Sequence, residues 1–280
     1  MRVSGRAAVS VGAIVLLLSA CSADPAPVPS QTVVPNGTPE PGVSAPDVSE
    51  EPFHGPSAVG PASIATATDA SVDVYDMADG DRERTVDAAD VLTAPGATPL
   101  TFLVKEDAGD WLEVYLPIRP NGSTGWIERD EVTVAQTDFR VEVSLVDFEL
   151  TVWKGGDDVL TTSIGVGRDD RPTPGGVYYI RELLQPPNPG GVYGPYAYGL
   201  SGYSPVLDEF NGGEAIIGMH GTNEPDSIGH YVSSGCIRMP NATITQLVTE
   251  VGLPLGTPVL ISEAASPLAN RTDGEAPADD

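Results

Sequence analysis

Two stretches of the chain alternate apolar and polar residues with a period of two, the pattern of half-buried β-strands. The first stretch, residues 66–135, is interrupted by turn sequences such as Asn121-Gly122. Short alternating segments divided by tight turns predict a small antiparallel β barrel or sandwich. The segments that carry this prediction are residues 72–75, 100–104, 111–116 and 125–127.

The second stretch, residues 136–262, predicts a further β-rich unit. One helix is expected at residues 243–251, where Asn241 would provide the N-cap and Gly252 would end the helix. The fold is therefore expected to be mainly β, with one or two short helices. The strands expected in this unit lie at residues 139–145, 148–153, 161–167, 173–180, 215–218 and 260–261.

The chain begins with Arg2 and Arg6, which precede an apolar run at residues 7–20. This run is shorter than the roughly 20 residues of a membrane-spanning helix, so residues 1–20 are predicted to be a secretory signal peptide. The sequence Leu-Ser-Ala-Cys that ends at Cys21 resembles the bacterial lipobox, in which cleavage leaves a lipid-modified cysteine at the new N-terminus. An ordinary signal peptide followed by a chance cysteine is the alternative.

Two further segments lack any apolar periodicity. Residues 21–65 are rich in proline and are expected to form a disordered tether. Residues 263–280 are acidic and rich in proline and alanine, and they are expected to be a disordered tail. The predicted folded part is therefore residues 66–262.

Composition excludes several classes of function. The chain has 40 acidic and 14 basic residues and a formal net charge of −26, whereas nucleic-acid binding needs clustered Lys and Arg. Its two cysteines cannot build a disulfide framework. Three histidines and two cysteines, none at ligand spacing, do not suggest a zinc site, so we expect neither a metal nor a cofactor.

A histidine and a cysteine near the end of the second unit could act together. An apolar strand leads to His220, and Cys236 follows sixteen residues later. Such a cysteine is a buried small hydrophobe, an intermolecular link or a nucleophile. A nucleophilic thiol needs an adjacent base, for which His220 is the obvious candidate. Gly235 removes a side chain where a substrate must approach, and it lets backbone N–H groups turn toward an oxyanion.

The surrounding motif makes the cysteine interpretation more specific. His-Gly-Thr-Asn from His220, followed by Ser-Ile-Gly-x-Tyr-Val-Ser-x-Gly-Cys-Ile-Arg-Met, resembles the signature of L,D-transpeptidases with a YkuD-type catalytic domain. Thr-Pro-x-Gly-x-Tyr-x-Ile at residues 173–180 resembles the substrate-side strand of that family. The resemblance extends over residues 138–262. It implies a β-rich sandwich for this unit.

The resemblance also implies roles for individual residues. Cys236 would be the nucleophile and His220 its general base, and the carbonyl of Gly221 would accept the other imidazole proton. The backbone amides near Ser234, Gly235 and Cys236 would form the oxyanion hole. Many members of the family carry histidine at the position of Ser234, so any role of that second histidine is missing here.

The expected substrate-binding residues are Arg238, Asn223, Tyr196 and Tyr198. Arg238 could bind a carboxylate of the stem peptide or brace its loop, and the sequence leaves both roles open. Tyr196 and Tyr198 belong to a tyrosine-rich run at residues 190–204 that, by resemblance, borders the donor-binding cleft. Core or loop packing is the alternative role for each tyrosine.

The first unit has a resemblance of its own. Residues 102–134, with Gly-Asp-Trp-Leu-Glu-Val and Gly-Trp-Ile-Glu, resemble bacterial SH3-type domains associated with the cell wall. This implies a small SH3-like β barrel. Trp111 and Trp126 could line a ligand groove, but aromatic packing in the core is the interpretation we favour.

Together these resemblances imply an exported, lipid-anchored L,D-transpeptidase that faces the cell wall from the outer side of the cytoplasmic membrane. Its donor and acceptor would be tetrapeptide stems of peptidoglycan, and its product a 3→3 cross-link. Two alternatives remain open at this point. One is a carboxypeptidase or endopeptidase on the same fold, and the other is a non-catalytic wall-binding lipoprotein.

Overall fold

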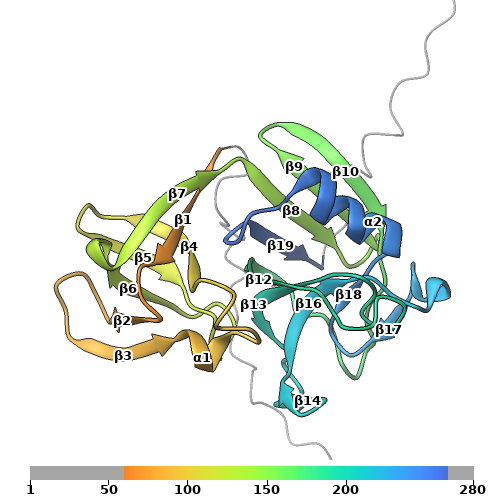
Figure 1. The fold of residues 1–280 in the computed structure, drawn as a ribbon, viewed down its shortest axis with the longest axis horizontal. Helices are drawn as coiled ribbons and strands as arrows, with labels where there is room; N and C mark the ends of the chain where they lie inside the picture. Colours follow the sequence, from red (N-terminus) through yellow and green to blue (C-terminus); the bar gives the residue numbers. More distant parts are fainter. Residues whose placement is uncertain (1–59, 264–280) are drawn as a thin grey trace, which may run out of the picture. The chain divides into compact units, whose positions relative to one another are not determined.

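The computed structural model describes residues 60–263, all of which fall within one compact unit. The described residues are mainly strands with short helices, so the predicted fold class is confirmed (Figure 1). The predicted signal peptide, the lipidation site Cys21, most of the tether and nearly all of the acidic tail lie outside the described residues. No helix among residues 60–263 is long and apolar enough to cross a membrane.

Seven strands form the N-terminal sheet, in which every neighbouring pair is antiparallel. Their order is β3-β2-β6-β5-β4-β1-β7 (Figure 1). A helical turn, α1 (Ala88–Val91), follows β3, and Asp87 caps it by accepting a hydrogen bond from the Ala89 N–H at 2.8 Å. The strands are β1 (Ala62–Ala67), β2 (Ser71–Tyr75), β3 (Arg82–Asp87), β4 (Thr101–Asp107), β5 (Trp111–Tyr115), β6 (Thr124–Glu128) and β7 (Val132–Thr137).

Eight strands form the C-terminal sheet, in the order β10-β9-β8-β19-β12-β13-β16-β18. Two of its pairs, β8 with β19 and β16 with β18, are parallel. Two small ribbons, β11 (Val166–Gly167) with β17 (Tyr231–Ser233) and β14 (Glu209–Phe210) with β15 (Gly213–Glu214), accompany it. The strands of the large sheet are β8 (Phe139–Ser144), β9 (Glu149–Lys154), β10 (Asp157–Ser163), β12 (Gly176–Leu184), β13 (Ala197–Tyr203), β16 (Ile216–His220), β18 (Ile237–Arg238) and β19 (Pro258–Ser262).

Each sheet has its own apolar core. In the N-terminal sheet the alternation of β2, β5 and β6 turns every second residue inward, so that Leu112 and Ile127 are fully buried. In the C-terminal sheet Ile217, Met219 and Ile237 belong to a larger core cluster. Because β16 places Ile217 and Met219 in that core, strand alternation turns Gly218 and His220 to the opposite face.

The predicted helix is present, but its N-cap is not the expected residue. Helix α2 (Asn241–Gln246) begins after Pro240 and continues as a wider helical turn, Leu247–Val251. Asn241 is therefore the first helical residue, and its side chain accepts a hydrogen bond from the Thr222 N–H at 2.9 Å instead of capping the helix. Gly252 ends the helix in the left-handed conformation, at φ 69°, as predicted.

Sequence alternation did not reveal every strand. β1 begins at Ala62, inside the segment predicted as tether, and pairs with both β4 and β7. Trp111 and Trp126 are half-buried and do not belong to the apolar core. The Trp111 ring instead meets the Tyr75 ring edge-on at 4.9 Å, and its Nε1 donates to Asp79 at 3.2 Å. That the N-terminal sheet is SH3-like stays a prediction.

Hydrogen bonds join the N-terminal sheet to strand β13. The side-chain amide of Asn121 donates to the Tyr203 carbonyl at 2.8 Å and accepts from the Tyr203 N–H at 2.9 Å. Tyr203 in turn donates its hydroxyl proton to the Pro117 carbonyl at 2.6 Å. β13 is a neighbour of β16, which ends at His220, so these bonds attach the N-terminal sheet close to the candidate site.

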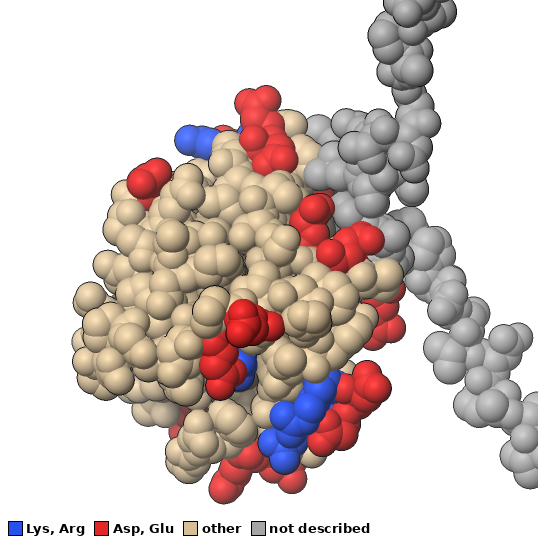
Figure 2. All heavy atoms as spheres, turned by 90° about the vertical axis from the view of Figure 1, so that its right-hand side faces the viewer, with Lys and Arg blue, Asp and Glu red and all other residues tan. Residues whose placement is uncertain are grey.

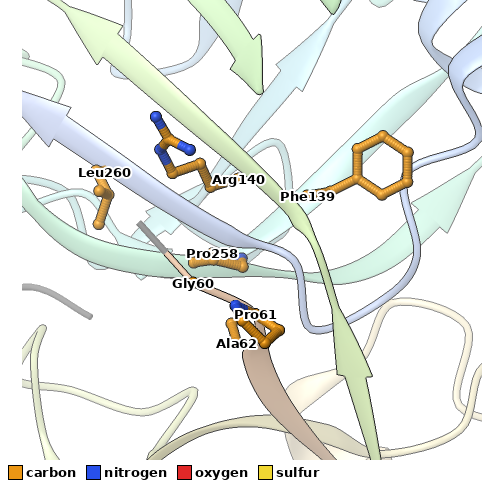
Figure 3. A pocket seen from close by; sticks show the side chains of 7 residues that line it. All are labelled: Gly60, Pro61, Ala62, Phe139, Arg140, Pro258 and Leu260. Carbon is orange, nitrogen blue, oxygen red and sulfur yellow. The ribbon is translucent and has the colours of Figure 1, made fainter. Parts of the chain in front are cut away.

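A cavity of about 60 Å³ lies where the start of β1 meets β8 and β19, beside Arg140 (Figure 3). It is too small for a substrate and is lined by none of the predicted site residues. On the face shown in Figure 2, acidic side chains occur in separate groups, and basic side chains are fewer.

Candidate active site

His220 stands at the end of β16 with its imidazole almost fully buried, at 4% exposure. Its Nδ1 lies 2.5 Å from the carbonyl oxygen of Gly221. A carbonyl can only accept, so Nδ1 carries the proton and the lone pair is on Nε2. Burial lowers the pKa of His220 to about 4, with a smaller contribution from the Arg238 guanidinium. The imidazole is therefore neutral at pH 7 and can accept a proton at Nε2.

Cys236 immediately precedes β18 and is half-buried. β18 pairs in parallel with β16, with Ile237 opposite Met219, so the next pair back places Cys236 beside Gly218. Its Sγ lies 3.9 Å from the Ile216 carbonyl oxygen. Burial raises the pKa of the Cys236 thiol, and a hydrogen bond from the Gly218 backbone and the Arg238 charge partly offset this. The resting group is a thiol.

The loop before Cys236 is held by side-chain hydroxyls. The Ser233 hydroxyl donates to the Cys236 carbonyl at 2.6 Å and accepts from the Gly235 N–H at 3.1 Å. Thr173 donates to the Gly235 carbonyl at 2.9 Å. Gly235 has a φ of 116°, which other residues rarely adopt. Because the Gly235 N–H is already bonded to Ser233, the amides of Ser234 and Cys236 are the better candidates for an oxyanion hole.

Arg238 braces a neighbouring loop. Its Nη1 lies 2.6 Å from the Glu224 carboxylate in an ion pair, and its backbone forms two hydrogen bonds with Gly165. Its Nε is buried and has no hydrogen-bond partner among residues 60–263. Arg238 and Cys236 both line a cavity of about 230 Å³. The ion pair with Glu224 supports the bracing role of Arg238. The Nε–H of Arg238 remains without an acceptor in a residue that lines the cavity.

The thiol and the imidazole share a larger cavity of about 700 Å³. His220 and Cys236 also line the smaller one, so the pair sits where the two cavities meet. Tyr193 lines both as well, and its ring meets the His220 ring edge-on, with 5.0 Å between centroids. Tyr193 was not among the expected site residues, although the tyrosine-rich run contained it. Its contact with His220 depends on the path of a loop, which local sequence does not reveal.

The other predicted substrate-binding residues are dispersed. Tyr198 is fully buried in the core, and its hydroxyl lies 3.5 Å from the Leu247 carbonyl. Tyr198 also borders the larger cavity. Burial raises the pKa of Tyr198 to about 12. Tyr196 packs partly buried against the same core, and Asn223 is exposed. The Ser234 hydroxyl accepts a hydrogen bond from Arg171 at 3.3 Å.

Among the described residues there is no cluster of three or more His, Cys, Asp or Glu side chains placed to hold a metal ion. What the site does contain is a thiol, a neutral buried imidazole oriented by a carbonyl, and the backbone amides of Ser234 and Cys236 beside the sulfur. This is the equipment for acyl transfer through a covalent thioester.

Comparison with known proteins identifies a family that resembles the part of the chain carrying this site. Residues 138–261 match the family model of the L,D-transpeptidase catalytic domain, YkuD. The proteins named YkuD in Bacillus licheniformis and Bacillus subtilis are 38% and 36% identical to this chain over 124 residues. Each alignment covers 44% of this chain and 66% of the relative, so the match spans just under two thirds of the length of these relatives.

Among solved structures, the catalytic domain of the E. faecium L,D-transpeptidase is 24% identical. The similarity covers 45% of this chain and 98% of that domain, with a TM-score of 0.32. The family match covers the same residues as the resemblance inferred from the motif and supports a YkuD-type L,D-transpeptidase catalytic domain at residues 138–261. The match does not extend to the N-terminal sheet.

Proposed function

We propose that this protein is a peptidoglycan L,D-transpeptidase that forms 3→3 cross-links. In the first half-reaction the Cys236 thiol gives its proton to Nε2 of His220, and the sulfur attacks the carbonyl that follows the L-centre of diaminopimelate in a tetrapeptide stem. The amide bond to D-Ala breaks, and D-Ala leaves with the proton returned by His220. The products are a thioester on Cys236 and free D-Ala.

In the second half-reaction, the side-chain amine of another stem attacks the thioester carbonyl. The bond between carbon and sulfur breaks, His220 transfers the proton from the amine to the sulfur, and a new amide joins the two stems. No oxidant, reductant or cofactor is consumed. The amides of Ser234 and Cys236 would stabilise the oxyanion in both half-reactions.

The observation that carries the proposal is the state of His220. An imidazole that is buried, neutral and oriented through Nδ1 by the Gly221 carbonyl presents a free lone pair in the same cavity as the Cys236 thiol. Both partners are uncharged in the resting site, because burial lowers the pKa of the imidazole and raises that of the thiol. Proton transfer would therefore accompany the attack, which makes His220 a general base.

The test is the intact mass of the full-length protein incubated with disaccharide-tetrapeptide, beside a Cys236→Ala variant. We expect a thioester adduct, released D-Ala and a cross-linked dimer with the parent protein, and none of these with the variant. Both proteins should show the same thermal unfolding. Tripeptide without dimer would identify a carboxypeptidase instead. A variant that still forms the adduct would contradict the mechanism.

We also propose that the protein is anchored through a lipid on Cys21 to the outer face of the cytoplasmic membrane. The lipobox-like sequence supports this, since acyl chains on one residue give stable anchoring. A Cys21→Ala variant should leave the membrane fraction, while its turnover of soluble donor remains within about twofold of the parent. Retention of the variant in the membrane fraction would rule out the lipid anchor.

A further inference from the structure

The larger cavity extends well beyond the thiol, over a floor made of glycines. Glu182 of β12 pairs with Gly199 of β13, and Gly199 pairs with Gly218 of β16, beside Cys236. All four residues line the cavity. Neighbouring strands lie about 4.8 Å apart, so this row places Gly199 about 10 Å from the backbone of Cys236. Because Gly218 has no side chain, an extended ligand can lie across the middle of the row.

The side chain of Glu182 lies over the far end of this floor. A Cβ added to Gly199 would be 2.7 Å from the Cγ of Glu182 and 2.9 Å from its Oε1. Its carboxylate is held by the N-terminal sheet, because the Thr93 N–H donates to Oε2 and the Thr93 hydroxyl donates to Oε1, each at 2.9 Å. Thr93 follows closely on α1, so the N-terminal sheet forms a wall of the cavity at this end.

Arg181 accompanies Glu182 at the same end. Both side chains are 1% exposed, and the Arg181 Nη2 lies 3.4 Å from the Glu182 Oε1. The Arg181 Nη1 donates to the Tyr203 hydroxyl at 3.1 Å. The Arg181 Nε, however, is buried and has no hydrogen-bond partner among the described residues. A buried guanidinium N–H left without an acceptor is costly, and here it occurs in a residue that lines a cavity.

The chemistry of this end selects one kind of ligand. The Arg181–Glu182 pair has no net charge, so it disfavours a group that is purely anionic or purely cationic. Arg181 retains one N–H to donate, and the Oε2 of Glu182, which accepts one bond from Thr93, has a further lone pair. A group that carries both an ammonium and a carboxylate satisfies both and keeps the site neutral.

We propose that Arg181 and Glu182 form a binding subsite for the amino-acid end of the acyl donor, a zwitterionic group held away from the reacting carbonyl. This inference rests on the proposed function, in which the donor carries diaminopimelate. The side chain of diaminopimelate ends in an ammonium and a carboxylate, six bonds from the reacting carbonyl. Six staggered bonds of about 1.5 Å span roughly 7–8 Å, and the Cys236 side chain and the thioester bond cover the rest of the roughly 10 Å between the Cys236 backbone and Gly199.

The test measures binding rather than turnover, so it does not depend on the catalytic proposal. Two disaccharide-tetrapeptide donors that differ at the third residue, diaminopimelate or lysine, are titrated calorimetrically into the full-length Cys236→Ala variant. Lysine retains the ammonium but lacks the carboxylate. We expect the diaminopimelate donor to bind about tenfold more tightly. Equal dissociation constants would overturn the subsite, whether or not the parent protein turns over either donor.

Further variants in the same Cys236→Ala background test whether Arg181 causes the preference for the diaminopimelate donor over the lysine donor. Arg181→Met should reduce the ratio of the two dissociation constants to about one. Arg140→Met is the matched control, because Arg140 also pairs with a glutamate on its own strand, Glu142 at 2.8 Å, but lines the small cavity of Figure 3 instead. It should keep the tenfold ratio. A ratio unchanged by Arg181→Met would contradict the proposal.

Arg181 is buried between the sheets, so its replacement could impair folding. Gly199→Ala provides a second variant that removes no polar group. The added methyl would displace the Glu182 carboxylate, which we expect to weaken both donors by about tenfold, since both carry the ammonium. Unchanged binding of both donors to a folded Gly199→Ala variant would overturn the role of Glu182.

Discussion

The two sheets differ in what they bury. In the N-terminal sheet the buried polar residues among those described are Thr101 and Thr137. The C-terminal sheet and its loops bury a much larger polar set: Ser144, Thr151, Thr173, Arg181, Glu182, Ser201, Ser204, His220, Thr222, Ser227, Ser233 and Thr257. Burying a polar group is unfavourable unless it finds a partner, so this set has to be justified by bonds within the sheet or by function.

The two faces of the C-terminal sheet differ in where these polar residues lie. One face of β12, β13 and β16 packs on the apolar core, and the opposite face carries Glu182, His220 and the cavity. The N-terminal sheet follows the simpler rule, with an apolar inner face and a half-exposed outer face. The contrast teaches that the N-terminal sheet buries mostly apolar residues, whereas the C-terminal sheet packs one face on its core and lines the larger cavity with the other.

The largest expected effect is a loss of acylation rate when a buried polar residue of the C-terminal sheet, His220, is replaced. Replacing His220 by Gln removes the proposed general base but keeps a polar side chain of similar size. A carbapenem serves as the probe, because the proposed Cys236 nucleophile would open its β-lactam ring and retain the acyl group as a thioester. Loss of a general base commonly lowers a rate by about 10²- to 10⁴-fold, so we expect this acylation of Cys236 to slow within that range. The measurement is stopped-flow acylation, followed by intact mass. A rate within threefold of the parent would exclude His220 as the base.

The same residue predicts a pH dependence of stability. Since the pKa of His220 falls from its ordinary value of 6.5 to about 4 in the folded protein, the unfolded chain binds more protons between these values. The contribution of neutral His220 to stability is thus fully present above pH 6.5 and is lost as the pH falls toward 4, by on the order of 3 kcal/mol. Urea unfolding of the parent protein should show this loss, and His220→Gln should show less of it.

Much of this comparison could be predicted from the sequence. Period-two alternation located β2, β5 and β6, in which every second residue is buried. The predicted segment 100–104 also located β4, although Thr101 to Val104 are all buried and do not alternate in burial. Alternation missed β3, whose residues Arg82 to Thr85 are all exposed. That strand forms by pairing with β2, from Ser71–Asp87 to Tyr75–Arg82, and such pairing leaves no local pattern.

For the site, the motif placed a histidine and a cysteine at a fixed spacing, and the structure puts both on one cavity. Thr93, Tyr193 and Asn241 could not be predicted in the same way. Each contacts the site or its cavity from a distant part of the sequence, as the Thr93–Glu182 bonds show. Asn241 even carried a misleading signal, since an asparagine before an apolar periodic segment is typical of an N-cap.

A smaller effect, on stability alone, tests the apolar side of the comparison. Leu112 is fully buried in the core of the N-terminal sheet. Leu112→Ala should lower the free energy of unfolding by about 2–5 kcal/mol, through lost burial and the cavity left behind. At temperatures where the variant is folded, its acylation rate should equal that of the parent. Urea unfolding and carbapenem acylation measure the two quantities.

A matched control lies on the same sheet. The exposed Lys105 forms an ion pair at 2.7 Å with the half-buried Glu113, which also accepts a hydrogen bond from Thr124. Lys105→Met should therefore change stability by less than about 1 kcal/mol. A Leu112→Ala variant that unfolds like Lys105→Met would show that the N-terminal core contributes little. The contrast between the two sheets would then have to be abandoned.

The smallest expected effect on the acylation rate is that of replacing Asn241, which contributes to the structure of the loop beside His220. Its side-chain oxygen accepts from the Thr222 N–H and lies close to Gly221, whose carbonyl orients His220. Asn241→Ala leaves a buried N–H without its acceptor, which should cost about 1–3 kcal/mol of stability and slow acylation several-fold as the carbonyl shifts. Asn241→Asp keeps an acceptor oxygen and should restore the rate. Only the Asn241→Asp variant can still accept the hydrogen bond from the Thr222 N–H beside Gly221. If the Asn241→Ala and Asn241→Asp variants are acylated equally slowly, this hydrogen bond does not position the Gly221 carbonyl, and Asn241 acts by packing alone.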